Sequence, residues 1–134
     1  MLEGFEKFTQ HGRSFKPKIS IRKRGQIGFN NGAIKRFRID KYDYVVLYYN
    51  KDTHKMAFNF TNSENDDGAI KIIKRKNNYF ISGKSFFDYY EIPYGESQSF
   101  DVEWNQEDLL AIIDIGDNKD NQDNREGISE LDEL

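Results

Sequence analysis

The side chains best suited to chemistry in this sequence are basic, and most of them lie in its first half. Residues 1–60 carry 13 Lys and Arg against 5 Asp and Glu, residues 61–115 carry 5 against 11, and residues 116–134 carry 2 against 7. The balances of +8, −6 and −5 sum to the net charge of −3. This asymmetry is typical of a polyanion-binding face or an acidic tail. A basic face that docks on the acidic half of the same chain is an equal alternative.

The basic residues occur in short runs. Arg22, Lys23 and Arg24 lead into the Gly25 turn, and Lys74-Arg75-Lys76 forms a similar run later in the chain. Guanidinium forks suit both phosphate oxygens and guanine edges, so such runs are candidate nucleic-acid contacts. An ordinary solvated turn is the alternative interpretation for each run.

The other candidate groups give no catalytic pattern. The two histidines, His11 and His54, stand 43 residues apart, and neither has carboxylates at ligand spacing. The absence of cysteine excludes disulfides, thiolate metal sites and a cysteine nucleophile. No Ser/His/Asp set, phosphate loop or dinucleotide-binding glycine pattern occurs. We therefore expect no enzyme activity, no cofactor and no metal.

Aromatic residues are the second unusual feature, at 15% of the chain. Tyr44–Tyr49 is apolar on both faces of a strand, which favours a central, covered strand. An exposed stacking platform, as in single-strand binders, is the alternative. A second aromatic group is too large for one helix face, so a protein-binding patch is plausible there. That group comprises Phe86, Phe87, Tyr89, Tyr90 and Tyr94.

These residues must be positioned by an internally repeated scaffold. At an offset of 51, six positions of the stretch 19–32 meet identical residues, including Ile19 with Ile70 and Gly32 with Gly83. At an offset of 55, Tyr49 meets Trp104 and Asn50 meets Asn105. Two diverged copies of one unit explain both registers, with a short insertion in Pro93–Ser99 between them.

Each copy is predicted to contain strand, strand, short helix, strand, strand. In the first copy, alternation predicts a strand over 19–22, and a second strand follows the turn over 26–29. Apolar residues at helical spacing predict a helix over 33–39. A β-branched and aromatic run over 44–49 predicts one strand of a hairpin, with its partner over 55–60. In the second, strands are expected over 70–73 and 79–81, a helix capped by Ser82 over 83–90, and a hairpin over 99–104 and 109–115.

The domain organisation follows from these elements. We expect an N-terminal arm over 1–17, the first ββαββ repeat over 18–61, a linker over 62–69, the second repeat over 70–115, and an acidic disordered tail over 116–134. One copy cannot cover both faces of its short strands. The two copies are therefore expected to close into one pseudo-symmetric, mainly β barrel with short helices.

Location and partners are predicted from what the sequence lacks. No apolar run approaches the roughly 18 residues that a membrane span needs. The N-terminus has no signal-peptide pattern. With no cysteine, a cytoplasmic protein without membrane contact is expected.

The segment Ile21-Arg-Lys-Arg-Gly-Gln-Ile-Gly-Phe then points to a family. It resembles the opening of AbrB/SpoVT-type swapped-hairpin domains, in which a basic strand reaches a Lys/Arg-Gly-Gln turn and a second strand. The stretch Arg36-Phe-Arg-Ile-Asp-Lys-Tyr-Asp-Tyr-Val-Val is similar to that family's helix exit and acidic turn. Two copies in one chain resemble the tandem MraZ-type regulators. The resemblance implies an AbrB-like or related double-psi barrel.

The resemblance also implies duplex DNA binding. At positions that match the family's motif, the resemblance assigns DNA contacts to the first strand, turn and helix of the first copy. The repeat extends this assignment to the corresponding positions of the second copy. These residues are Lys18, Arg22, Lys23, Arg24, Lys35, Arg36, Arg38, Lys74 and Arg75.

The leading hypothesis is a non-catalytic DNA-binding protein that acts in transcription regulation or as an accessory factor. The alternatives are a protein-interaction module built on the aromatic helix of the second copy and a single-stranded nucleic-acid binder. A protein partner and a homodimer are both possible assemblies. The acidic tail either keeps the protein in solution or folds over the basic face and competes with DNA.

Overall fold

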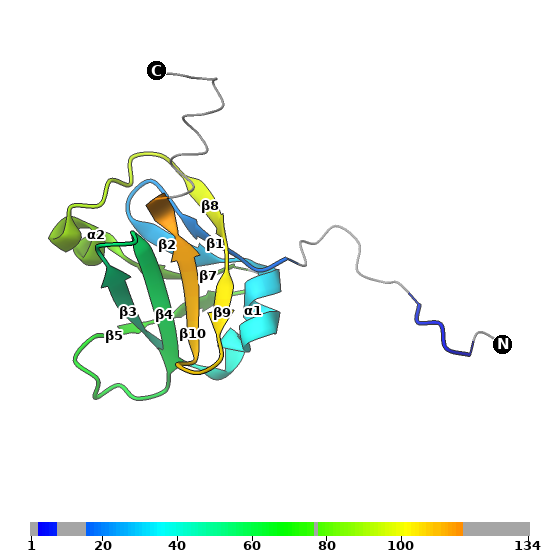
Figure 1. The fold of residues 1–134 in the computed structure, drawn as a ribbon. Helices are drawn as coiled ribbons and strands as arrows, with labels where there is room; N and C mark the ends of the chain where they lie inside the picture. The colour runs from blue at the N-terminus through cyan, green and yellow to red at the C-terminus, as the bar shows by residue number, and fades with distance from the viewer. Residues whose placement is uncertain (1–2, 8–15, 77, 117–134) are drawn as a thin grey trace, which may run out of the picture.

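The computed structural model describes residues 3–7, 16–76 and 78–116, which contain ten strands, two short α-helices and one 3-10 helix. The fold is mainly β, as predicted, with two five-stranded antiparallel sheets (Figure 1). Most of the predicted arm and the predicted tail beyond Gly116 lie outside the described residues. Phe5, which belongs to the described part of the arm, is 77% exposed.

Sheet A and sheet B each combine strands from both halves of the chain. Sheet A has the order β6 (Ile73–Arg75), β7 (Asn78–Ser82), β2 (Gln26–Phe29), β1 (Lys18–Ile21) and β8 (Gln98–Asp101). Sheet B has the order β5 (Ala69–Lys71), β3 (Tyr44–Asn50), β4 (Lys55–Thr61), β10 (Leu110–Asp114) and β9 (Glu103–Asn105). Ala69, which was expected in the linker, belongs to β5.

The predicted single closed barrel is not what the structure contains. Its strands form two separate sheets, because two expected strands are each interrupted by one residue. Ile72 separates β5 from β6, and Val102 separates β8 from β9, so the chain passes from one sheet to the other at both seams. At the first seam the Ile72 amide donates to the Asp43 carbonyl at 2.9 Å, and the Ile72 side chain is buried.

One hydrophobic core lies between the sheets. Ile19, Ile27 and Ile81 of sheet A and Phe58 and Ile113 of sheet B are at most 1% exposed. Phe29 reaches across between the layers, and its ring meets those of Phe58 and Phe60 edge-on at 5.9 and 5.7 Å. Burial of these large apolar side chains is the main favourable contribution to such a fold.

Helix α1 (Asn31–Phe37) begins two residues before its predicted start because Asn30 caps it. The Asn30 side chain accepts from the Ala33 amide at 2.8 Å and from the Lys18 amide at 3.0 Å, which ties the helix to β1. The helix ends at Arg38, which adopts the left-handed conformation at φ 57° and donates its amide to the Ile34 carbonyl. The short 3-10 helix η1 (Ile39–Lys41) follows.

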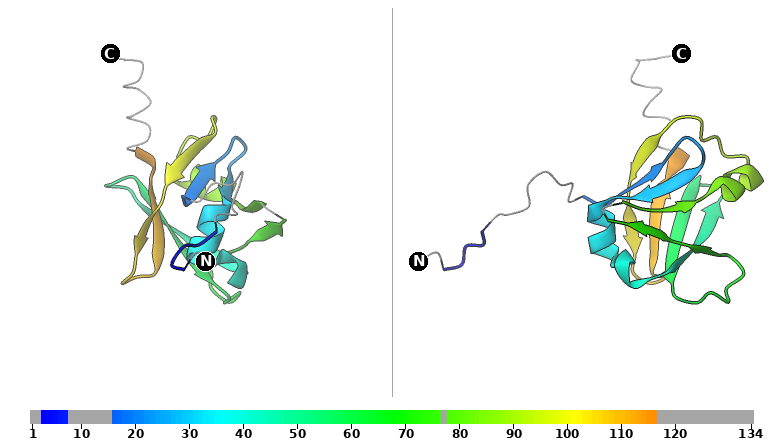
Figure 2. Two further views of the ribbon diagram at one scale, coloured as in Figure 1. Left: turned by 90° about the vertical axis from the view of Figure 1, so that its right-hand side faces the viewer. Right: turned by 180° about the vertical axis from the view of Figure 1, so that it is seen from behind.

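Helix α2 (Lys84–Tyr90) has Gly83 at its N-cap, with no side-chain cap, so the predicted Ser82 cap is wrong. The view from behind in Figure 2 shows α1 and α2 on opposite sides of the molecule. Among the described residues, neither helix is long and apolar enough to cross a membrane.

Candidate nucleic-acid interface

The outer face of sheet A, termed the sheet A face, is polar and nearly free of acids. Since Ile19, Ile27, Ile81 and Phe100 point into the core, their strand neighbours point outward. The outward set comprises Lys18, Ser20, Gln26, Gly28, Ile73, Arg75, Asn78, Phe80, Ser82, Ser99 and Asp101. Ser20, Ser82 and Ser99 in this set have small polar side chains.

Arg22 directly follows β1, and its side chain lies across the sheet A face. Its guanidinium contacts the position where Gly28 lacks a side chain, and a Cβ there would collide with it. Arg22 Nη1 donates to Gln26 Oε1 at 2.6 Å, and Nη2 donates to Asn78 Oδ1 at 3.4 Å. Both acceptors are neutral amides, so the position of the cation is fixed while its charge is not neutralised.

Asp101 is the one acid in the outward set, and it forms ion pairs with two lysines. Lys18 Nζ lies 2.6 Å from its Oδ1, and Lys16 Nζ lies 3.2 Å from its Oδ2. Hydrogen bonds from Lys18 and then Lys16 hold the pKa of the Asp101 carboxyl below its usual value. The predicted contact residue Lys18 is therefore partly neutralised within the protein.

Lys23 and Arg24 are exposed in the tight turn between β1 and β2. The turn needs Gly25, whose φ of +81° favours glycine. The Gly25 carbonyl also accepts from the Gly83 amide at 2.8 Å, which fixes the turn against the start of α2. The two basic side chains therefore extend from a rigid support.

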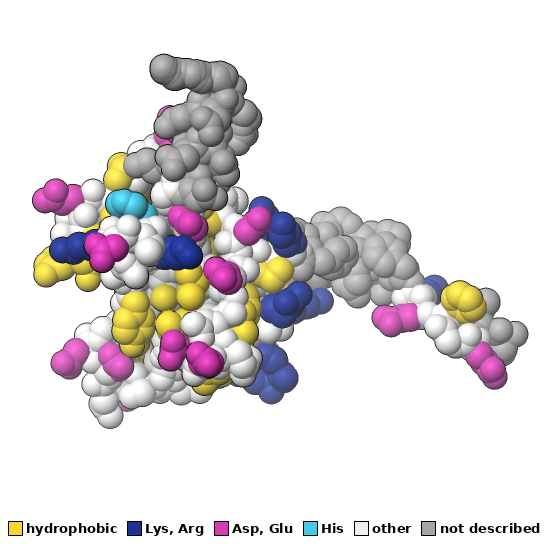
Figure 3. Space-filling model, in the orientation of Figure 1, with side chains coloured by type: hydrophobic (Ala, Val, Ile, Leu, Met, Phe, Trp, Pro, Cys, Tyr) yellow, Lys and Arg dark blue, Asp and Glu magenta, His cyan; other side chains and the backbone are white. Residues whose placement is uncertain are grey.

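The structure does not gather all the predicted basic residues on one surface. The turn precedes β2 and α1 follows it, so Lys35, Arg36 and Arg38 lie at the other end of that strand (Figure 1). Basic side chains gather on the side of the molecule where α1 lies (Figure 3). The single surface expected over residues 18–38 is therefore two separate regions.

The two predicted residues of the second copy also diverge. Arg75 is exposed on the sheet A face, where its register partner Asn78 binds Arg22. Lys74 instead donates to the Asp40 carbonyl at 3.0 Å and lies 3.6 Å from Asp43 Oδ1 and above the Tyr79 ring. Lys74 thus joins β6 to the segment after α1, a structural contact that the sequence did not indicate.

A cavity of about 480 Å³, termed the Trp104 pocket, adjoins the second basic region. The Phe37 ring of α1 stacks on the Trp104 ring of β9, with centroids 5.2 Å apart and planes 20° apart. Trp104 Nε1 donates to Gln106 Oε1 at 2.8 Å. The remaining lining comes from Arg36, Arg38, Tyr42, Asn59, Phe60 and Leu109.

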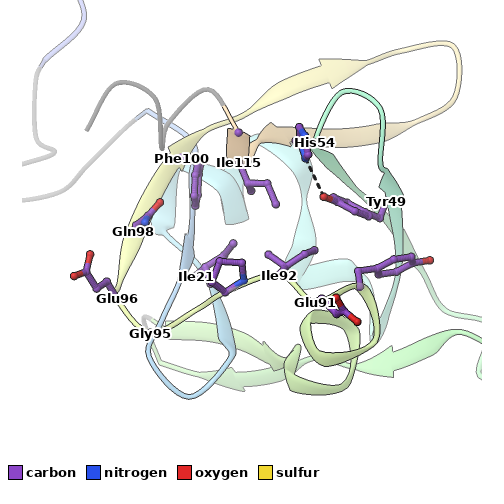
Figure 4. A pocket seen from close by; sticks show the side chains of 13 residues that line it. Ile21, Tyr49, His54, Glu91, Ile92, Gly95, Glu96, Gln98, Phe100 and Ile115 are labelled. Atoms are coloured by element: carbon purple, nitrogen blue, oxygen red, sulfur yellow. Dashed lines mark hydrogen bonds between the residues drawn. The ribbon is translucent and has the colours of Figure 1, made fainter. Parts of the chain in front are cut away.

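A second cavity of about 490 Å³, termed the His54 pocket, lies near the end of α2 (Figure 4). The Tyr49 and Tyr90 rings meet there at 4.9 Å, and the Tyr49 hydroxyl lies 3.3 Å from His54 Nδ1. Glu91 and Glu96 line this pocket, together with the apolar side chains of Ile21, Ile92, Phe100 and Ile115.

The two pockets occupy corresponding places in the two halves of the chain. The helices end in the left-handed residues Arg38 and Glu91, with φ,ψ of 57°,42° and 57°,43°. The hairpins contain the left-handed residues His54 and Leu109, with φ of 58° and 56°. These four are the non-glycine residues with positive φ among those described, and each lines its pocket.

The repeat aligns Trp104 with Tyr49, which belongs to the run considered as a stacking platform, but no pattern marked Trp104 as a site residue. No sequence signal showed that Trp104 would meet Phe37, because the contact joins two elements far apart in the chain. Gln26 and Asn78, which hold Arg22, were missed for the same reason.

Neither a metal centre nor a known relative offers a guide to the site. Within residues 3–7, 16–76 and 78–116, no group of three or more His, Asp and Glu could hold a metal ion. Comparison of the chain with protein-family models, curated proteins and solved structures gives no match.

Proposed function

We propose that this protein is a non-catalytic DNA-binding protein, regulatory or accessory in role, that contacts duplex DNA through the sheet A face and the β1–β2 turn. The observation that carries the proposal is Arg22, fixed over Gly28 by two neutral amides on a face whose one outward acid is Asp101. A guanidinium held in place loses less side-chain freedom when it binds a phosphate.

Charge supports the same surface. Lys23, Arg24 and Arg75 are exposed there, and the described residues give them no ion pair. Each such cation that neutralises a phosphate releases a condensed counterion, which makes binding salt-dependent. Docking of the basic half on the acidic half would require the cations of residues 1–60 to be paired. Among the described residues of that half, Lys16 and Lys18 are the ones that form ion pairs with an acid of the second half.

The AbrB-like origin and the tandem repeat belong to this proposal. Supporting them, strands, helix and hairpin recur in the same order, and the four left-handed residues fall at corresponding positions. At the offset of 51, Arg75 corresponds to Arg24. In this proposal both contact the duplex, Arg24 from the β1–β2 turn and Arg75 from β6. The footprint then lies on sheet A and its turn, and α1 does not contribute to it.

Fluorescence anisotropy of a labelled duplex, measured from 50 to 200 mM salt, tests the proposal. We expect affinity to fall with a steep log–log slope, and the Arg22→Ala/Arg24→Ala variant to reduce that slope by about 2. The matched control, Lys51→Gln/Lys71→Gln, removes two exposed charges elsewhere and should leave the slope within experimental error. An equal reduction of the slope in both variants would show that binding depends on net charge alone and would reject the proposed surface.

The protein-interaction alternative receives less support. Phe87 of the aromatic group is fully buried, and Phe86, Tyr90 and Tyr94 pack against the core, which leaves Tyr89 at 79% exposed. One exposed tyrosine is a small anchor for an interface. Absence of duplex binding at 50 mM salt would nevertheless leave this alternative in place.

A further inference from the structure

The Trp104 pocket combines a pair of stacked aromatic rings with two exposed arginines. We propose that it binds one unpaired nucleobase together with its phosphate, from a single-stranded nucleic acid or a free nucleotide. Its volume of about 480 Å³ lies within the usual range for small-molecule sites, roughly 300–1,000 Å³. This inference is independent of duplex binding by the sheet A face.

Stacking is provided by a ring that is already fixed. Phe37 covers one side of Trp104, and the hydrogen bond to Gln106 restrains the indole in its plane. Trp104 is nevertheless 38% exposed, so part of its surface is available to a further planar group. Bases of any sequence stack on aromatic side chains, because every base has a π face.

The charge of the pocket selects an anion. Arg36 and Arg38 line it, both are exposed, and the described residues give neither an ion pair. No Asp or Glu lines the pocket. The backbone of Arg38 is fixed by its left-handed conformation and its bond to Ile34, so its side chain starts from a defined point at the rim. Arginine suits the geometry of a phosphate group.

The His54 pocket provides an internal comparison. It repeats the architecture with an aromatic pair, Tyr49 and Tyr90, and a left-handed residue on either side. Yet Glu91 stands where the Trp104 pocket has Arg38, and Glu96 adds a second acid. The same scaffold therefore carries opposite charge in its two pockets, and only the Trp104 pocket is suited to a phosphate.

Trp104 is the one tryptophan in the chain, so its intrinsic fluorescence reports on this pocket directly. Titration at 50 mM salt uses adenosine, adenosine monophosphate, an oligodeoxythymidine and a hairpin duplex. We expect saturable quenching by the oligonucleotide, and weaker or no quenching by adenosine, which lacks the phosphate. Quenching by the monophosphate as well would identify free nucleotides as a source, whereas its absence would restrict the ligand to single strands.

Two variants, each with a matched control, test whether the quenching arises from binding in the Trp104 pocket. Arg36→Gln/Arg38→Gln should lower the apparent affinity of the oligonucleotide, measured from the quenching, about tenfold or more, because hydrogen bonds to charged groups are lost. The matched control Lys51→Gln/Lys71→Gln should bind the oligonucleotide with an affinity within about twofold of that of the parent protein. Phe37→Leu should weaken single-strand binding, while Tyr90→Leu, at the corresponding place in the His54 pocket, should not. Circular dichroism of each variant verifies that it is folded.

The outcomes separate this inference from the proposed function. Duplex binding at the sheet A face with no quenching by any single strand overturns the inference alone. Quenching by single strands that is insensitive to the arginine variants also overturns it, and so does saturable quenching by adenosine that is as strong as quenching by its monophosphate. Quenching by single strands without duplex binding supports the inference and overturns the proposed function.

Discussion

At the scale of single residues, Asp101 limits the charge of the sheet A face. It is the one acid in the outward set, and it forms ion pairs with Lys18 and Lys16. The three side chains are exposed, at 37–67% accessible, so these ion pairs contribute little to stability. Their effect on a bound polyanion is larger, because Asp101 holds both lysines and cancels one of their two positive charges.

Asp101→Asn should therefore bind duplex DNA more tightly than the parent protein. Release of Lys16 and Lys18 should increase affinity about three- to tenfold at 50 mM salt and steepen the salt slope by up to about 2. Anisotropy of the labelled duplex measures both quantities. Asp67→Asn, an exposed acid in the loop before β5, is the matched control and should show neither change. Unchanged binding by Asp101→Asn would place the footprint away from Lys18.

Two carboxyls make stability depend on pH in the acid range. Hydrogen bonds from Lys84 and Tyr94 lower the pKa of Asp88, and those from Lys18 and Lys16 lower that of Asp101. A carboxyl whose pKa is lower in the folded state stabilises the fold at pH above its pKa in the unfolded chain, 3.8. This stabilisation is lost as the pH falls through the pKa of the folded state. We expect the melting temperature to fall below about pH 4. The melting temperature of an Asp88→Asn/Asp101→Asn variant should fall less steeply over that pH range.

At the scale of elements, the β1–β2 turn depends on its contact with α2. A methyl group at Gly25 would lie 2.9 Å from Lys84 Cα, and the residue's φ of +81° strains any other side chain. Gly25→Ala should therefore lower the free energy of unfolding by about 1–3 kcal/mol. Urea denaturation measures it. Gly95→Ala is the control, because nothing lies within 4 Å of its added methyl group, and its change should remain within about 0.5 kcal/mol.

Elements with a clear local pattern were predictable from the sequence. The sequence pattern located β1, β2, β3 and β4 to within one residue. Alternation indicated one buried face in β1 and β4, and a β-branched and aromatic run indicated β3. The breaks at Ile72 and Val102 were not predictable, because they reflect the geometry of two sheets meeting at a seam. Likewise the runs Arg22–Arg24 and Lys35–Arg38 were adjacent in sequence, yet β2 separates them in space.

At the scale of the whole molecule, the distribution of charge predicts an effect of the C-terminal residues. Residues 116–134 carry 7 acids against 2 basic residues, and the first 60 residues have a balance of +8. A covalently attached acidic segment acts at high effective concentration and competes with a nucleic acid for the same cations. Deletion of residues 117–134 should therefore raise duplex affinity at 50 mM salt.

The control for that deletion keeps the length and removes the charge. Replacement of the seven acids by Asn and Gln should raise the affinity as much as the deletion does. At 300 mM salt both variants should approach the parent protein, because the competing attraction is screened. An affinity that is the same with and without the segment at 50 mM salt would rule out this competition.

The pairing of strands across the two halves has a consequence for synthesis on the ribosome. Within the first 61 residues the ladders available are β1 with β2 and β3 with β4. Their remaining partners, β5, β7, β8 and β10, are translated later, and β1 waits for β8, some 80 residues on. The nascent chain therefore emerges as two hairpins with uncovered apolar faces. Its first half is the part of the polypeptide most dependent on chaperones, and it becomes protease-resistant only when the last strand leaves the exit tunnel.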